Sequence, residues 1–258
     1  MGTCTVLAVG CHPDDIEFMM GGTLLLLKSL DAELHYMNLA NGSCGTVEHS
    51  VEEIVRIRET EARQAASYLG AHWHPSIAND LEVIYAIDLV RKTAAVVRSI
   101  APDIILVPAL RDYMEDHMHT ARIVLTAAFA RAMPNFRTIP AVPPVRKETA
   151  VYHALPYGLQ DGLGNRASAH FYVDITQVID NKEAMLAMHR SQRNWLDESQ
   201  LIDSYLQTMR DMSSEVGQMA GGTYTYAEGW VRHNSLGYAA VSFTPLEDML
   251  KEQIQTQG

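Results

Sequence analysis

The fold is decided by a stretch near the start of the chain, Thr5-Val6-Leu7-Ala8-Val9-Gly10-Cys11-His12-Pro13-Asp14-Asp15. Its unbroken apolar run is typical of a strand buried on both faces of a parallel sheet. A helix-like run over residues 15–30 follows, so His12, Asp14 and Asp15 stand at the carboxyl end of a predicted central strand. Open α/β sheets build their sites at this end. Three such side chains concentrate charge in one place, and a bound cation is the simplest way to stabilise them.

Strand-like and helix-like runs alternate through the first half of the chain. Strands are predicted at residues 3–9, 33–39, 72–75 and 103–108, and helices at residues 15–30, 51–69, 84–100 and 117–133. The second helix has the clearest boundaries, because Ser50 and Glu53 form a capping box and Gly70 is a natural stop. This order predicts a three-layer α/β/α sandwich with a mostly parallel sheet and right-handed crossovers.

The second half continues the pattern after a proline-rich stretch at residues 134–144, which is short enough to be a loop. Strands are predicted at residues 149–155 and 170–175, helices near 177–189 and 199–220, a loop or strand at 223–230, and a last short helix. We therefore expect a single domain over residues 1–258, a length that one α/β unit with a decorated C-terminal part can reach.

Composition and charge narrow the class of protein. The 258 residues include 20 basic and 31 acidic side chains, a net charge of −11. Such an acidic balance argues against nucleic acid or an anionic membrane as the main partner. No apolar run reaches the length of a membrane span, and the first residues lack the pattern of a secretion signal. The three cysteines indicate reduced thiols, so we expect a cytoplasmic protein.

The predicted site has the ligands of a hydrolytic metal centre, which needs about three protein ligands and an open position for water. His12 and Asp15 supply two ligands, and His117 is the third, since it stands where a loop after the strand at 103–108 enters a helix. Its neighbour Asp116 can orient the ligand imidazole. Asp14 is the remaining carboxylate and stands where a general base is needed. Two imidazoles and one carboxylate favour Zn2+, and Fe2+ fits the same ligands.

His12-Pro13-Asp14-Asp15 resembles the signature of the PIG-L/LmbE-like family of zinc-dependent N-acetylglucosaminyl deacetylases. Further matches follow in family order: Gly21-Gly22-Thr23, Arg58-Glu59-Thr60-Glu61-Ala62, Asp116-His117 and Tyr226-Ala227-Glu228-Gly229. The resemblance covers most of the chain. It implies a Rossmann-like fold, a metal held by His12, Asp15 and His117, Asp14 as the base, and Arg58 near the substrate.

One position departs from the family pattern. The family's second motif usually begins with a histidine that assists as an acid or stabilises the tetrahedral intermediate, and this chain has Met114 there. A thioether can do neither. His119 or Tyr113 is a candidate replacement, or Asp14 works alone as base and then acid. A third interpretation is that the protein has diverged toward another substrate or toward weak activity.

The resulting hypothesis is a metal-dependent amide hydrolase. Its expected substrate is a small N-acetylated amino sugar or glycoconjugate, from which it removes the acetyl group. The alternative is a non-catalytic or weakly active homologue that binds a metal or a sugar, which Met114 favours. The sequence leaves open the exact substrate, the native metal and whether the chain forms a homo-oligomer.

Three simpler structural explanations compete with this hypothesis, each for particular side chains. Asp14 or Asp15 would serve equally well as a cap that complements the helix dipole. Arg58 has Glu61 and Glu53 as ion-pair partners on its own helix. His72 and His74 share one face of a strand, but without a carboxylate beside them in sequence we expect a surface placement and no metal.

Overall fold

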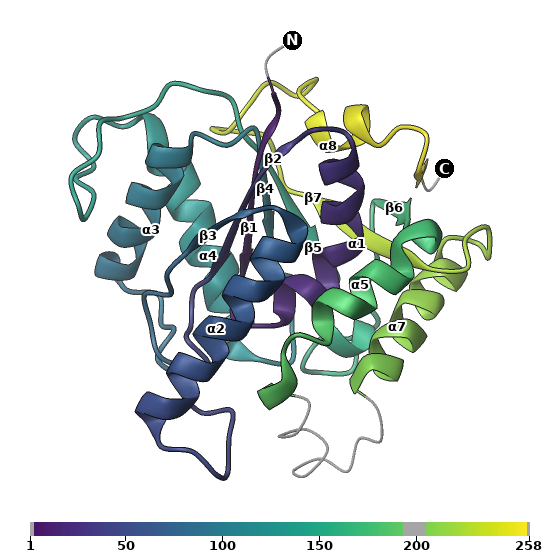
Figure 1. Cartoon of the computed structure of the whole chain (residues 1–258). Helices are drawn as coiled ribbons and strands as arrows, with labels where there is room; N and C mark the ends of the chain where they lie inside the picture. Colours follow the sequence, from purple (N-terminus) through teal and green to yellow (C-terminus); the bar gives the residue numbers. More distant parts are fainter. Residues whose placement is uncertain (1–2, 193–204, 257–258) are drawn as a thin grey trace.

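The computed structural model describes residues 3–192 and 205–256. Within these residues, eight strands form one sheet in the order β3-β2-β1-β4-β5-β7-β6-β8 (Figure 1). The strands are β1 (Thr5–Gly10), β2 (Glu33–Asn38), β3 (His72–His74), β4 (Ile104–Val107), β5 (Ala150–Ala154), β6 (Phe171–Asp174), β7 (Ala227–Arg232) and β8 (Ile254–Thr256). The main helices are α1 (Asp15–Ser29), α2 (Val51–Leu69), α3 (Ile87–Ile100), α4 (Glu115–Phe129), α5 (Ile179–Leu186), α7 (Tyr205–Met219) and α8 (Pro245–Met249).

The first five strands along the sheet, β3-β2-β1-β4-β5, are parallel, and β7, β6 and β8 continue it antiparallel. The prediction of a mostly parallel sheet is thus confirmed. β8 at the far edge was not predicted, because its three residues acquire strand structure only by pairing with β6. The predicted helix at 199–220 is seen as α7, and its residues 199–204 lie outside the described residues.

Helices cover both faces of the sheet, which confirms the three-layer α/β/α architecture. Successive residues of β1 face opposite layers: Val6 and Ala8 belong to the core beneath α1 and α2, whereas Leu7 and Val9 belong to the core beneath α3 and α4. Figure 1 shows α3 and α4 on one side of the sheet and α1, α2, α5 and α7 on the other. Across the described ranges, no helix combines the length and apolarity needed to cross a bilayer.

Local sequence signals set the ends of α2. The Ser50 hydroxyl accepts a hydrogen bond from Glu53 N at 3.3 Å, and the Glu53 carboxylate accepts one from Ser50 N at 3.1 Å. Gly70 ends the helix with φ 72°, a left-handed conformation that suits glycine. By contrast, α3 begins three residues later than predicted. Tertiary contacts hold the segment before it outside the helix, including a hydrogen bond from Leu81 N to Asp116.

Candidate active site

The turn between β1 and α1 carries three of the predicted site residues. Asp15 Oδ2 accepts hydrogen bonds from the backbone N–H groups of Cys11 and His12, both at 2.8 Å, which fixes the turn. Asn38 of β2 donates to the His12 carbonyl at 2.7 Å. Asp14 has φ 117°, a backbone conformation that is strained for a residue with a side chain, and its carboxylate makes no capping bond to α1. Helix capping therefore does not explain Asp14, and its carboxylate lines a cavity instead.

Sheet topology brings His117 to this turn. β1 and β4 are parallel neighbours, so the loops at their carboxyl ends meet, and α4 follows the loop after β4. His117 Nε2 lies 3.6 Å from Asp15 Oδ1, and His12 Nδ1 lies 3.8 Å from Asp15 Oδ2. One donor atom from each of the three residues falls within 4.8 Å of the others. The donor set therefore has the spacing and chemistry of a three-ligand divalent metal site.

A further carboxylate holds each of the two imidazoles. Asp116 Oδ2 lies 3.2 Å from His12 Nε2, and Asp112 Oδ1 lies 3.1 Å from His117 Nδ1. This corrects the expectation that Asp116 orients its neighbour His117, because adjacent side chains on a helix point in different directions. Asp112 was missed, although it stands in the same loop. Carboxylates of this kind fix the ring orientation of metal-binding histidines.

Cys11, His12 and Asp116 form a second group of donor atoms with the same spacing. His12, Asp15 and His117 all line the cavity described below, whereas Cys11 and Asp116 are not among its lining residues in the described chain. The group of His12, Asp15 and His117 is therefore the better metal site.

Two buried side chains hold the Asp14 carboxylate. Tyr205, at the start of α7, donates a hydrogen bond to Asp14 Oδ2. The Arg58 guanidinium lies 3.6 Å from Asp14 Oδ1 and donates to the Pro13 carbonyl at 2.6 Å. Burial raises the pKa of Asp14 to about 6, against the pull of Arg58. Burial and the Asp14 charge raise the pKa of Tyr205 well above its ordinary value, so the phenol stays protonated and remains a donor.

Arg58 lines the cavity but is almost completely buried, with a side chain that is 2% exposed. A Cβ added to Gly42 would lie 2.4 Å from Arg58 Cδ, and one added to Gly45 would lie 2.5 Å from Arg58 Nη1. The loop after β2 therefore packs closely over Arg58 and needs glycine at both positions. In this arrangement Arg58 contacts the turn and the Asp14 carboxylate.

The cavity has a volume of about 350 Å³ and opens beside the predicted metal site. One wall is aromatic: the ring centroids of Phe18 and Tyr157 are 5.1 Å apart, and those of Tyr157 and Tyr113 are 5.9 Å apart. Met114 also lines the cavity. His119 is not among its lining residues in the described chain, and its Nδ1 lies 2.8 Å from the Val83 carbonyl oxygen.

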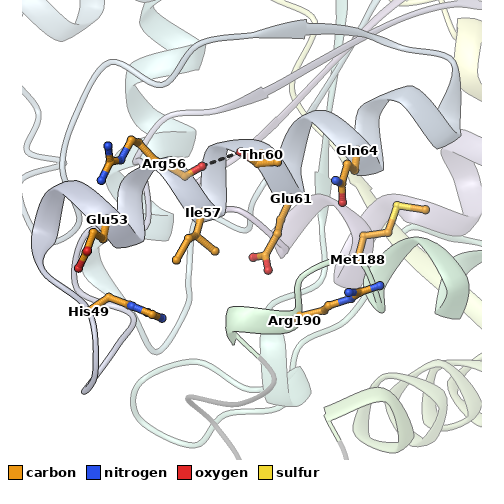
Figure 2. A pocket seen from close by; sticks show the side chains of 9 residues that line it. All are labelled: His49, Glu53, Arg56, Ile57, Thr60, Glu61, Gln64, Met188 and Arg190. Atoms are coloured by element: carbon orange, nitrogen blue, oxygen red, sulfur yellow. Dashed lines mark hydrogen bonds between the residues drawn. The ribbon is translucent and has the colours of Figure 1, made fainter.

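A larger cavity of about 600 Å³ lies between α2 and the end of α5, and it shares no lining residue with the first. Figure 2 shows Glu61 pointing from α2 toward the segment that carries Met188 and Arg190. The Glu61 carboxylate is already occupied, since it accepts a hydrogen bond from Ser191 N at 2.9 Å. The volume of a cavity alone does not identify a functional site. The titratable side chains that converge on one point are in the smaller cavity.

The regions of this chain that match known proteins include both sequence motifs that supply the predicted metal ligands. A family model for PIG-L, GlcNAc-PI de-N-acetylase, matches residues 7–128. A diacetylchitobiose deacetylase of Thermococcus kodakarensis is 27% identical over 231 residues, which cover 87% of this chain and 81% of that protein.

Two solved structures establish the fold. An N,N'-diacetylchitobiose deacetylase from Pyrococcus horikoshii superposes with a TM-score of 0.71 at 22% identity, over 94% of this chain and 88% of that one. The 4-carboxy-2-hydroxymuconate hydratase GalB from Pseudomonas putida superposes with a TM-score of 0.73 at 20% identity, over 90% and 97%. The family match over residues 7–128 includes both predicted metal motifs, and the chain is similar over most of its length to deacetylases of the PIG-L/LmbE type.

Proposed function

We propose that this protein is a zinc-dependent N-deacetylase that hydrolyses the acetamide of a small N-acetylated amino sugar or glycoconjugate, acting as a single domain. One observation supports this best. The donor atoms of His12, Asp15 and His117 converge within 4.8 Å, and the Asp14 carboxylate lines the same cavity. Two imidazoles and a carboxylate suit Zn2+, with Fe2+ as the second choice.

Asp14 is the proposed general base. When bound, the metal would supply a water of lowered pKa and a positive charge for the amide oxygen. The Asp14 carboxylate takes the proton from the attacking water, and Arg58 and Tyr205 hold it in place while it does so. Asp112 and Asp116 keep the two imidazoles in their ligand orientation. The amine leaves after it accepts a proton, for which the protonated Asp14 is the nearest identified source.

The cavity supports a sugar as the substrate. Its volume suits a small ligand, and the faces of Phe18, Tyr113 and Tyr157 offer an apolar wall for the C–H face of a sugar ring. The diacetylchitobiose deacetylase relatives give the same substrate class, because their substrate carries N-acetylglucosamine units.

Tyr113 is the better of the two candidate replacements for the missing histidine. Its ring packs edge-on against His117 at a centroid distance of 5.6 Å, and burial raises the pKa of its phenol, which remains a donor. His119 contacts Val83 instead. Tyr113 is therefore the proposed donor to the oxyanion, and Met114 is a wall residue.

The test is acetate release from a panel of N-acetylated amino sugars and disaccharides, with the metal content measured in parallel. The Asp14→Asn variant is expected to keep its metal and to lose about 100-fold or more in kcat. A His12→Ala, His117→Ala double variant is expected to lose the metal of this site and to lose activity. Full activity of Asp14→Asn would contradict the assigned base.

Two other outcomes would replace the proposal. Bound metal without turnover of any amide would favour the binding homologue that Met114 suggests. Because GalB has this fold and is a hydratase, unsaturated carboxylic acids belong in the same panel, and turnover of these alone would assign hydration instead.

A further inference from the structure

A second group of imidazoles lies on β2 and β3, at the edge of the sheet. The register pairs His35 with His72, and His74 follows two residues later on the same face. Glu33, two residues before His35, also points to this face. None of the four residues lines the candidate active-site cavity. Tertiary structure thus provides the carboxylate and the third imidazole that the sequence around His72 and His74 lacked.

The two nearest imidazoles of this group have a spacing that suits a shared cation. His35 Nδ1 and His74 Nε2 are 2.9 Å apart, near the separation of about 3.3 Å for two nitrogens on a tetrahedral zinc ion. The other nitrogen of His35, Nε2, lies 3.5 Å from Glu33 Oε1. A carboxylate on the far nitrogen is the arrangement that fixes metal-binding histidines, and the structure shows it at His12 and His117 as well.

His72 is the third imidazole, and its side chain must rotate before its nitrogens converge with those of His35 and His74. Its ring centroid is 5.0 Å from that of His35, and its Nε2 lies 3.9 Å from Glu33 Oε1. Its side chain is 68% exposed, so rotation about its side-chain bonds can bring it toward the other two imidazoles at little cost. The site would then hold three imidazoles and leave a position for water.

Contacts on the opposite face of β3 hold the strand that carries His72 and His74. Trp73, between the two histidines of β3, faces the opposite side of the strand and packs against the main core. The Arg63 guanidinium of α2 covers its ring, with the Arg63 Cζ atom 3.6 Å from the ring centroid. This contact holds the edge strand in register, which keeps His72 and His74 beside His35.

We propose that His35, His72 and His74, with Glu33 orienting His35, form a second divalent transition-metal site that is independent of the proposed catalytic centre. Zn2+ is the ion it would take under ordinary conditions, since imidazole-rich sites select zinc, copper and nickel over calcium and magnesium. The competing account is a simple hydrogen bond between the rings of His35 and His74.

The experiment counts Zn2+ on chelator-treated protein without a histidine tag, by calorimetric titration and elemental analysis. Wild type is expected to bind two ions per chain. The His12→Ala, His117→Ala variant is expected to keep one with a Kd of about 10 µM or tighter, and the His72→Gln, His74→Gln variant is expected to keep the other. His49→Gln, at an exposed histidine outside the group, is the matched control and should keep both.

A second set of measurements does not depend on the His72→Gln, His74→Gln double variant. His72→Gln alone changes an exposed side chain and should weaken the edge site about tenfold, and Zn2+ should raise the Tm of His12→Ala, His117→Ala. Zinc binding lost entirely in His12→Ala, His117→Ala, or two ions retained in His72→Gln, His74→Gln, would overturn the second site. Failure of acetate release would refute the proposed function and leave this result intact, because the two sites share no residue.

Discussion

Asp14 is held by two side chains that are distant from it in sequence. Tyr205 hydrogen-bonds to one carboxylate oxygen and Arg58 lies beside the other, while the Asp14 backbone is in a strained conformation. Strain of this kind persists only where surrounding contacts impose it. The geometry of the base therefore depends on α2 and α7 together, and the short motif that contains it is insufficient.

Tyr205→Phe tests this dependence at a single atom. The variant removes the hydroxyl that donates to Asp14 and keeps the ring, so kcat is expected to fall about tenfold with little change in KM or metal content. Tyr68→Phe is the control, because its hydroxyl only accepts a hydrogen bond from Asn181 in an exposed contact. Equal kinetics in the two variants would mean that Tyr205 does not position the base.

The pH profile tests the ionisation of Asp14. A general base must be ionised, so kcat/KM should fall as the pH drops through the pKa of Asp14 and should be constant above it. Burial raises this pKa to about 6 in the protein without metal, and a nearby cation lowers it. The acidic limb should therefore have its midpoint at pH 6 or below. A midpoint clearly above that value would assign the limb to another group.

Among the elements, α2 was predicted from local sequence with both ends correct. Its capping box joins residues three positions apart, and the Gly70 N–H bonds to carbonyls three and four positions before it, so local sequence specifies both ends. The start of α3 and the existence of β8 depend on Asp116 and β6, which lie far away in the sequence. Local signals cannot encode such contacts.

Ser50→Ala is the corresponding test at the element scale. Losing the hydroxyl that accepts from Glu53 N should lower the free energy of unfolding by about 1 kcal/mol, measured by urea denaturation. Ser50→Asp keeps a capping oxygen and should restore most of the stability. A loss that Asp fails to restore would show that the serine acts by some means other than capping.

At the scale of the whole molecule, the buried carboxylate of Glu228 links the two halves of the chain. Glu228 of β7 accepts hydrogen bonds from the backbone N–H groups of Gly22 and Thr23 in α1, both at 2.8 Å, and its Oε1 lies 2.8 Å from Lys182 Nζ of α5. Gly22 lies close against Ile175, whose side chain would meet an added Cβ at 2.6 Å. The family-like segments around Gly22 and Glu228 are thus structural partners.

Glu228→Gln and Lys182→Met test this junction. Each single change leaves a buried partner without its counter-charge and should destabilise the fold by about 3–5 kcal/mol, whereas the double variant should cost less than the sum of the two. Urea denaturation of the four proteins gives the coupling energy. Additive losses would mean that the two side chains act independently.

The sequence by itself determined the α/β class and most of the element order, and it predicted His12, Asp14, Asp15 and His117 as the candidate site. Those features follow from hydrophobic periodicity, local capping and the known geometry of strand ends, all of which act over short distances. Only the tertiary structure decided that Asp116 orients His12, that Asp112 orients His117, that Tyr205 holds Asp14, and that Glu33 and His35 join His72 and His74. Each of these contacts joins side chains whose relative direction depends on how whole helices and strands pack, and no local pattern in the chain specifies that packing.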